Sequence, residues 1–168
     1  MTLEELNALP DDEAAEQLRG CCGSSRWVKS MLERRPFTSV EELLRQASDA
    51  WRAADPSDWH EAFAHHPRIG ERKSEKHQTA QGREWSADEQ AALNQTQAGI
   101  LSELSRVNQD YEKRFGHIYI VCAAGLTAEE MLAIARKRMK NDTDTELRVA
   151  AEEQRKITEL RLLKLLGD

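Results

Sequence analysis

Residues 64–70 read Ala-His-His-Pro-Arg-Ile-Gly and residues 85–90 read Trp-Ser-Ala-Asp-Glu-Gln, and together they supply the parts of an acid/base site. A histidine titrates near neutral pH and can therefore take or give a proton. Pro67 disfavours the α-helical conformation for the residue before it, so we expect His66 to lie extended at a helix end and to project into a cleft. Alternatively, His66 ends the helix and binds a main-chain carbonyl.

Ser86 and Glu89 stand three residues apart at the start of an expected long helix. This spacing matches a capping box, in which each side chain binds the other residue's backbone amide. A helix N-terminus also attracts anions through its free amides and its dipole, so a structural and a functional role are compatible. Gln90 adds an amide that can both donate and accept a hydrogen bond.

Arg161 is predicted to point inward, because it falls on the apolar stripe of the last helix. A buried guanidinium requires an anionic partner, since an unpaired buried charge costs several kcal/mol. The partner could be a protein carboxylate such as Glu89, or a substrate carboxylate held by two parallel hydrogen bonds. The sequence leaves both open. The stripe consists of Leu147, Ala150, Gln154, Ile157 and Arg161.

Metal binding is disfavoured by the spacing of the candidate ligands. His60, His65 and His66 lie near one another in the sequence, but there is no HExxH pattern and no carboxylate at a familiar ligand spacing. The spacing of the cysteines does not favour a metal site either. Cys21 and Cys22 are adjacent and Cys122 is distant, which gives neither a zinc motif nor a disulfide framework and fits a reducing compartment.

The composition favours one cytoplasmic domain over residues 1–168. The 24 Lys and Arg residues stand against 30 Asp and Glu residues, giving a net charge of −6 without a basic stripe, so nucleic acid is not an expected partner. The acidic N-terminal sequence does not fit a signal peptide, and the longest apolar run, residues 118–126, is too short to span a bilayer. We therefore expect no membrane partner.

Helix signals dominate the chain and predict an all-α bundle of about eight helices. Thr2 with Glu5 and Thr127 with Glu130 match capping boxes. Further N-cap candidates are Thr38 or Ser39, and Ser57. The expected helices cover about residues 2–8, 11–20, 25–34, 38–53, 57–65, 87–115, 128–140 and 144–166.

Two segments do not fit the helical pattern. Residues 66–85 are polar, lack periodicity and form a long loop of the kind that is more often functional than inert. Residues 117–123 are the one β-like run, and the sequence offers no second strand to pair with them. We expect this run to be an extended segment buried between helices, whose backbone N–H and C=O groups need other partners.

The order and spacing of several short motifs resemble those of 2-oxo-4-hydroxy-4-carboxy-5-ureidoimidazoline (OHCU) decarboxylases from about Phe37 to Leu166. Two departures are visible: Tyr119 stands where phenylalanine is more usual, and Ala92 where glycine is common. The motifs are His66-Pro67-Arg68-Ile69-Gly70, Ser86-x-x-Glu89-Gln90, Phe115-Gly116 leading into Tyr119-Ile120-Val121-Cys122, and the ending Asn141-Asp142, Glu146-Leu147, Lys156-Ile157, Arg161-Leu162 and Leu165.

This resemblance implies a cofactor-independent carboxy-lyase of purine catabolism that decarboxylates OHCU to (S)-allantoin late in urate degradation. It implies a helical bundle that is commonly a homodimer. His66 would be the catalytic histidine, acting at the substrate hydroxyl, with Glu89 tuning or relaying the proton. The substrate would be held by Pro67, Ser86, Gln90, Tyr119, Ile120, Val121, Cys122 and Arg161.

Two other classes of function remain open on the residues alone. A metal-dependent hydrolase would use the cluster of His60, His65 and His66. A non-catalytic helical interaction module would use Arg161 and the Ser86–Glu89 pair as structural elements only.

Overall fold

The computed structural model describes residues 1–69 and 98–167, and these parts of the chain contain eight helices and no strand. The predicted all-α class is therefore confirmed. Seven helices begin and end within two residues of their expected positions, and the eighth is described from Ala98 onward, so its expected first part lies outside the described residues. The helices are α1 (Leu3–Ala8), α2 (Asp11–Cys21), α3 (Ser25–Glu33), α4 (Val40–Arg52), α5 (Pro56–Ala64), α7 (Ala98–Phe115), α8 (Ala128–Arg138) and α9 (Thr143–Leu165).

Both predicted capping boxes that fall in the described residues are present. The Thr127 hydroxyl accepts from the backbone N–H of Glu130 at 3.1 Å, and the Glu130 carboxylate accepts from the backbone N–H of Thr127 at 2.9 Å. Thr2 and Glu5 bind each other in the same way at the start of α1. Ser39 caps α4 through the backbone N–H of Glu42.

The N-cap predicted for α5 is wrong, because Asp55 holds that position in place of Ser57. Pro56 occupies the first helical position, where its fixed φ and missing N–H suit the start of a helix. The helix therefore starts at Pro56, one residue ahead of the serine, and Ser57 is already inside it.

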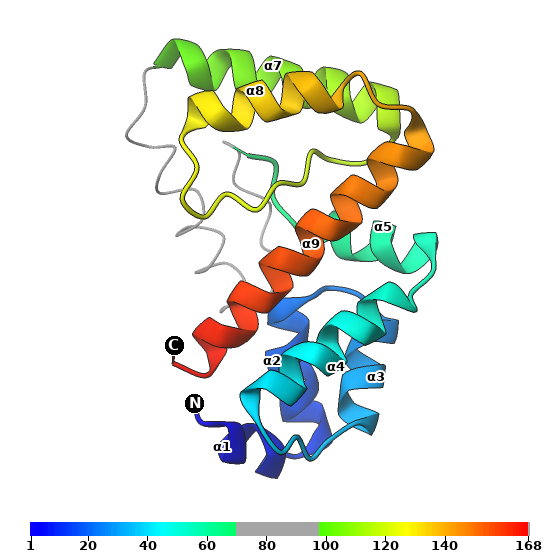
Figure 1. Cartoon of the computed structure of the whole chain (residues 1–168), viewed down its shortest axis with the longest axis vertical. Coiled ribbons are helices and arrows are strands. Elements are labelled where there is room, and N and C mark those ends of the chain that lie inside the picture. Colours follow the sequence, from blue (N-terminus) through cyan, green and yellow to red (C-terminus); the bar gives the residue numbers. More distant parts are fainter. Residues whose placement is uncertain (70–97, 168) are drawn as a thin grey trace.

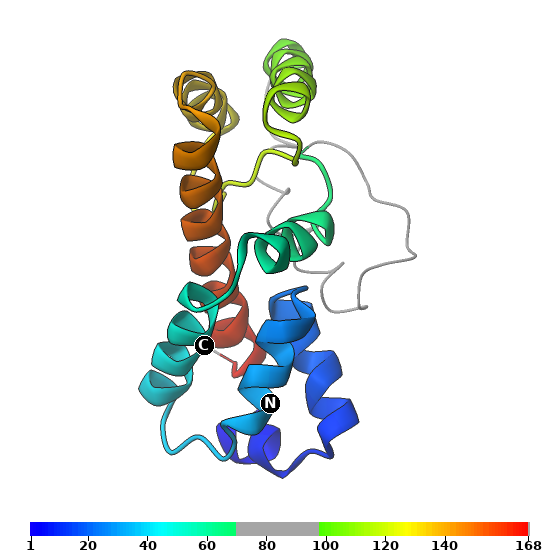
Figure 2. The same cartoon turned by 90° about the vertical axis from the view of Figure 1, so that its right-hand side faces the viewer.

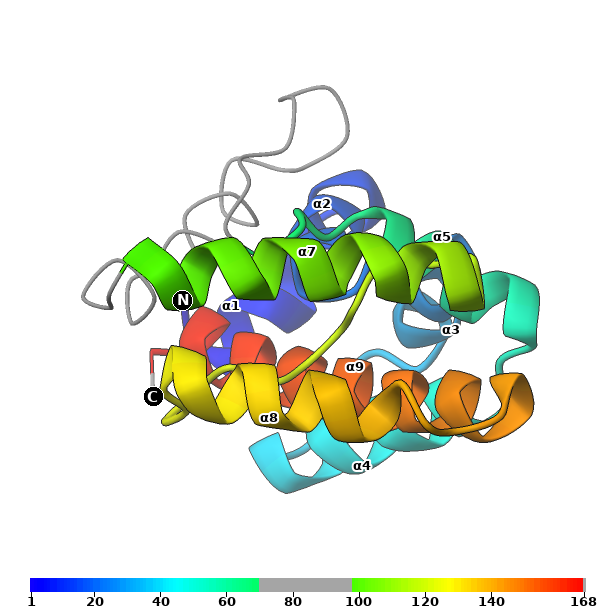
Figure 3. The same cartoon turned by 90° about the horizontal axis from the view of Figure 1, so that it is seen from above.

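The helices form two groups that α9 connects (Figure 1). Helices α1 to α4 pack around the C-terminal half of α9, and α7 and α8 lie side by side at its other end (Figures 1 and 2). α7 and α8 run in the same direction, so residues 116–127 cross back beneath them to join the two (Figure 3). None of the described helices combines the length and the apolar content that a membrane crossing requires.

Each group has its own apolar core. The larger core joins α2 to α5 with α9 and includes the fully buried side chains of Leu18, Trp27 and Phe63. The smaller core lies between α7 and α8 and includes Leu104 and Met131. On α9 the predicted inward stripe is buried at Ala150, Gln154, Ile157 and Arg161 and partly buried at Leu147.

The extended segment, residues 117–123, lies between the two cores. Its side chains alternate, as those of an extended chain must. Tyr119 and Val121 join the core of α7 and α8, while Ile120 joins the core around α9. The prediction of a buried, unpaired extended run is confirmed, because these residues form neither helix nor strand.

Removing the cap of α8 tests whether the local signal at Thr127 contributes to stability. We expect Thr127→Ala to lower the free energy of unfolding by about 0.5–2 kcal/mol, because a backbone N–H at the helix start loses its acceptor. Thr143→Ala is the matched control, since Thr143 is an exposed threonine at the start of α9 that caps nothing. Urea unfolding measures both, and equal losses would contradict the capping role.

Candidate active site

His66 reaches from the end of α5 to α9. Its backbone N–H donates to the carbonyl of Phe63 at 3.1 Å, which closes the last turn. Its ring Nε2 lies 2.6 Å from Oε1 of Gln154, and only 7% of the residue is exposed. The side chain therefore turns away from its own helix and toward the inward face of α9.

His65 makes the contact with a main-chain carbonyl that the alternative interpretation assigned to His66. Its ring Nδ1 lies 2.9 Å from the carbonyl oxygen of Glu61, one turn earlier in α5. The His65 ring also packs against Gly23, where an added Cβ would lie 2.3 Å from the ring Cγ. The two adjacent histidines thus have different surroundings: His65 binds a carbonyl of its own helix, and His66 binds the side chain of a residue on α9.

The chain after His66 is tied to α7. The guanidinium of Arg68 binds the Glu112 carboxylate in a bidentate pair, with distances of 2.6 and 3.0 Å. The amide of Asn108 donates to the carbonyl of Ile69 at 3.2 Å. These contacts fix the direction of the chain as it leaves His66.

Arg161 points inward as predicted, and 6% of it is exposed. Its Nη1 donates to the carbonyl of Gly20 at 3.3 Å, at the C-terminal end of α2. It lies on the same face of α9 as Gln154, two turns further along, or about 10 Å along the helix axis. Glu89, its candidate protein partner, lies outside the described residues.

Cys21 and Cys22 lie in this buried region but are not poised for reaction. Burial raises the pKa of Cys22 to about 12, although a backbone hydrogen bond and the charge of Arg161 act in the opposite direction. Burial also raises the pKa of Cys21. Since the thiolate is the reactive form, both thiols are packing groups at neutral pH.

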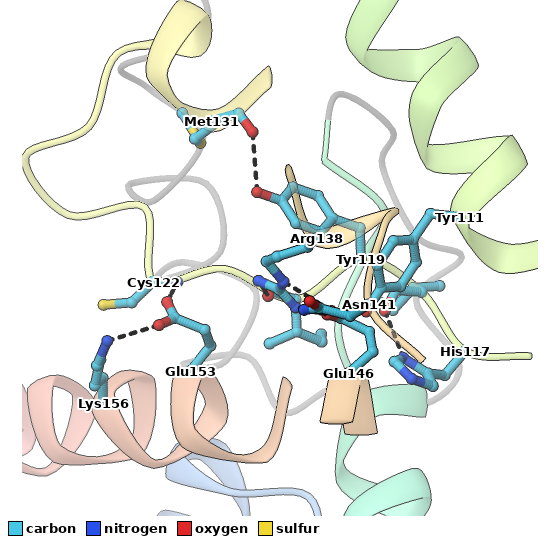
Figure 4. A network of polar contacts seen from close by, with 12 residues as sticks. Tyr111, His117, Tyr119, Cys122, Met131, Arg138, Asn141, Glu146, Glu153 and Lys156 are labelled. Atoms are coloured by element: carbon cyan, nitrogen blue, oxygen red, sulfur yellow. Dashed lines mark hydrogen bonds and ion pairs between the residues drawn. The ribbon is translucent and has the colours of Figure 1, made fainter. Parts of the chain in front are cut away.

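The backbone of the extended segment is bound by side chains in place of a neighbouring strand. Nη1 of Arg138 donates to the carbonyl of Ile120 at 2.6 Å, and the backbone N–H of Cys122 donates to the Glu153 carboxylate at 2.8 Å (Figure 4). Lys156 binds the same Glu153 carboxylate at 2.6 Å, one turn along α9. Helices α8 and α9 therefore both hold the segment that lies between the two cores.

His117 holds the start of the segment. Its ring Nδ1 lies 3.0 Å from the carbonyl of Ile118, so Nδ1 must carry the hydrogen, because a carbonyl only accepts. Burial lowers the pKa of His117, while the bond to Ile118 acts in the opposite direction. The neutral ring packs among the aromatic rings of Phe63, Tyr111 and His60.

Arg138 is itself held by a fully buried carboxylate. Glu146 has no exposed surface, and its Oε1 lies 2.7 Å from Nε and 2.6 Å from Nη2 of Arg138. The Tyr111 hydroxyl donates to the same oxygen, and the Asn141 amide donates to the other at 3.0 Å (Figure 4). Burial acts to lower the pKa of Arg138, but the hydrogen bond to Glu146 and the electrostatic effects of Tyr111, Glu146 and Tyr119 together outweigh it, and the net change is upward. The Glu146 carboxylate therefore faces a charged guanidinium, and both of its oxygens accept hydrogen bonds.

Tyr119, at the position where the resemblance led us to expect phenylalanine, uses its hydroxyl to bind α8. The hydroxyl donates to the carbonyl of Met131 on α8 at 3.0 Å. The Arg138 guanidinium lies over the Tyr119 ring, 4.9 Å from its centroid, which adds a cation–π contact. The substitution thus gives the extended segment one more bond to α8.

The three histidines of the metal alternative do not converge. His66 binds Gln154, His65 binds Glu61, and the His60 ring packs edge-on against His117 with centroids 5.5 Å apart. Within residues 1–69 and 98–167, no group of three potential ligands could hold a metal ion. A pocket of about 400 Å³ beside His60 is lined in part by Phe63, Arg68, Glu112 and His117, and includes no described residue of the predicted substrate site.

The structure brings part of the predicted site to α9, namely His66, Arg161, Ile120 and Cys122, whereas the side chains of Tyr119 and Val121 lie in the core of α7 and α8. Pro67 follows directly after His66. Ser86, Glu89 and Gln90 fall outside the described residues, as does the part of the predicted 66–85 loop that begins at residue 70.

Comparison with known proteins decides the family. The family model described as OHCU decarboxylase matches residues 7–163. The chain belongs to the OHCU decarboxylase family. A crystal structure of OHCU decarboxylase in the presence of (S)-allantoin superposes with a TM-score of 0.78 and 37% identity, covering 91% of this chain and 99% of that one. A structure of (S)-allantoin synthase, 18% identical, shares the fold with a TM-score of 0.74 and covers 99% of this chain and 54% of that one.

Relatives of this OHCU decarboxylase family member differ in length. The uric acid degradation bifunctional protein TTL of Arabidopsis thaliana is 40% identical over 154 residues, which are 91% of this chain and 47% of that protein. The chain thus spans about half the length of that relative. An OHCU decarboxylase of Haloferax volcanii is 29% identical over 96% of this chain and 94% of its own length.

Sequence reasoning missed the residues that support the site, namely Arg138, Glu146 and Glu153. Arg138 ends the basic run of residues 136–138, a pattern typical of solvated charges at a helix C-terminus. Gln154 carried a usable signal, because it is a polar residue on an otherwise apolar stripe. A buried amide needs hydrogen-bond partners, which predicts a polar group facing it.

Breaking the buried pair of Arg138 and Glu146 tests its energetic role. We expect Glu146→Leu to cost about 3–5 kcal/mol of unfolding free energy, because it leaves Arg138 buried without its partner. The double variant Arg138→Met/Glu146→Leu should recover at least about half of that loss, since neither charge is then left uncompensated.

The control is the half-exposed pair of Arg136 and Glu103, where Glu103→Gln should cost less than about 1 kcal/mol. Urea unfolding of all variants gives the comparison. A loss in the double variant that equals the sum of the losses in the single variants Arg138→Met and Glu146→Leu would show that the two side chains do not act as a pair.

Proposed function

We propose that this protein decarboxylates OHCU to (S)-allantoin in urate degradation and that residues 1–168 form one decarboxylase domain. The match to the OHCU decarboxylase family over residues 7–163 carries the proposal. The contacts of His66 and of the extended segment with α9, which also carries Arg161, support it, because these are the groups that the reaction needs.

The reaction needs no added electron sink. When the bond to the carboxylate breaks, CO₂ leaves and its bonding electrons move toward the adjoining C=N bond of the ring. The nitrogen of this C=N bond takes one proton. The hydroxyl on the carbon that released CO₂ loses its proton and becomes a carbonyl, and the other carbon of the C=N bond takes a proton that creates the stereocentre of allantoin. The protein therefore has to hold the carboxylate, take the hydroxyl proton and expose one face to protonation. Positioning and a placed acid/base supply such effects, so we propose a reaction without metal or cofactor.

We assign the hydroxyl proton to His66. It is the acid/base group that reaches α9 from α5, and its buried position suits a group that must act in a water-poor site. Glu89 is proposed to tune or relay this proton. Ser86, Gln90 and Pro67 are proposed to contact the substrate beside it.

Arg161 is proposed to hold the substrate carboxylate, and the extended segment to bind the amide-like edges of the ring. In an extended chain the backbone groups of alternate residues point to opposite edges. The contacts of His117, Arg138 and Glu153 occupy groups of Ile118, Ile120 and Cys122, which share one edge. We therefore propose that the substrate pairs with the groups of Tyr119 and Val121 on the other edge.

The direct test generates OHCU in situ from urate and follows its decay by absorbance, with and without the protein. Circular dichroism of the product reports the handedness of allantoin. The proposal requires a faster decay and an excess of the (S) form in the presence of the protein. An unchanged decay with racemic product would overturn it.

The role of His66 is tested by His66→Asn, which should lower the rate of decarboxylation by at least ~10²-fold, because proton transfer is lost while a polar side chain remains. His65→Asn is the matched control and should keep most of the turnover, since His65 binds a helix carbonyl. Circular dichroism and thermal melting check that both variants fold. Near-normal turnover in a folded His66→Asn protein would assign the proton transfer to another group.

Arg161→Lys tests whether the Arg161 guanidinium binds the substrate carboxylate. Lysine keeps the charge but lacks the planar fork, so we expect weaker binding of OHCU and of carboxylate-bearing mimics. Neutral ring analogues such as allantoin should lose much less affinity, because they have no carboxylate. Titration calorimetry with both ligand types measures the difference. Equal weakening would instead place Arg161 in an internal ion pair.

We also propose that the protein acts as a homodimer in the cytoplasm, with OHCU as its small-molecule partner. The resemblance to the family supports the dimer. Sedimentation equilibrium of the full chain distinguishes a dimer from a monomer.

A further inference from the structure

We propose that Gln154, held by Thr158, determines which ring nitrogen of His66 carries the proton, and thereby makes Nδ1 the nitrogen that accepts the substrate proton. Gln154 is a positioning residue in this proposal, which rests on the catalytic role proposed for His66. The three residues are almost fully buried: Gln154 has no exposed surface, Thr158 is 5% exposed and His66 is 7% exposed.

The orientation of the Gln154 amide follows from the bonds of Thr158. The Thr158 hydroxyl lies 3.0 Å from the main-chain carbonyl of Gln154, one turn earlier in α9, and donates its single hydrogen there. Its oxygen is then an acceptor for any other partner. The Gln154 side-chain nitrogen lies 3.1 Å from this oxygen and donates to it.

The other end of the amide therefore faces His66. Oε1 of Gln154 lies 2.6 Å from Nε2 of His66. An amide oxygen only accepts hydrogen bonds, so Nε2 must carry a hydrogen. In a neutral imidazole this leaves Nδ1 without a proton, as the base.

The contact between Nε2 of His66 and Oε1 of Gln154 also fits the protonated state of His66. When His66 takes the substrate proton at Nδ1, the ring becomes positively charged, and both nitrogens are donors. The hydrogen bond from Nε2 to Oε1 remains and becomes charge-assisted, so no group has to rotate during the transfer. Fixing the tautomer in this way also fixes the ring plane against α9.

Nuclear magnetic resonance of the full chain labelled with ¹⁵N-histidine tests the proposal directly, because ¹⁵N shifts distinguish the two tautomers. The His66 signals are assigned by their loss in His66→Asn. We expect a neutral His66 protonated at Nε2 in the wild type. Gln154→Leu and Thr158→Val should shift the population toward the other tautomer, whereas Thr158→Ser should retain the wild-type pattern because it keeps the hydroxyl.

The matched control is Trp51→Phe, which removes a different buried hydrogen bond onto the same helix, that from Nε1 of Trp51 to the carbonyl of Ala151 at 2.8 Å. It should leave the His66 tautomer unchanged. In turnover of OHCU, Gln154→Leu should lower kcat by about 10–100-fold with little change in KM, since an acid/base in the wrong tautomer loses most of its ~10²–10⁴-fold effect.

A wild-type His66 protonated at Nδ1 would overturn the proposal, and so would an unchanged tautomer in Thr158→Val and Gln154→Leu. If Gln154→Leu does not fold, the comparison of Thr158→Val with Thr158→Ser decides the question. Failure of this proposal can be distinguished from failure of the catalytic role of His66. A wrong catalytic role would appear as normal turnover in His66→Asn, whereas the resonance experiment reports the tautomer without any turnover.

Discussion

The buried ion pair between Arg138 and Glu146 is the interaction on which the arrangement of the candidate site depends. The extended segment, residues 117–123, separates two apolar cores, and no described strand pairs with it. Backbone groups buried without partners are costly, so side chains must supply what a sheet would supply. Arg138 does this for Ile120, and a buried guanidinium can do so only when an anion compensates its charge. Glu146 provides that anion, together with a link to α9.

Helix α9 then joins the parts of the site into one body. Along its length it supplies Glu146 to the ion pair, Glu153 to the backbone of Cys122 and Gln154 to His66, and it carries Arg161. A site built on one long helix holds its groups more accurately than a site built on loops. Because the same helix packs against α2, α4 and α5, the geometry of the site is tied to the main core.

Local signals made much of this structure predictable. Apolar periodicity and capping residues predicted the helices and the inward position of Arg161, and the β-like run of residues 117–123 predicted the extended segment, because each of these signals depends on neighbours in the sequence. The N-cap at Asp55 was missed where Pro56 shifts the start of the helix. The ion pair was missed for a different reason: Arg138 looks like a solvated helix-end charge, and its partner on α9 is specified only by tertiary packing. Gln154 lay on the predicted stripe, but its partner His66 is 88 residues away.

Amide hydrogen exchange across the extended segment in Arg138→Met/Glu146→Leu measures directly whether the ion pair holds this segment in place. This variant removes both charges and keeps the apolar volume, so the main core should stay protected. If the ion pair holds the segment, the amides of residues 119–122 should exchange faster than in the wild type, with α2 and α3 unchanged. Wild-type exchange rates at 119–122 in a folded double variant would show that the ion pair does not hold the segment.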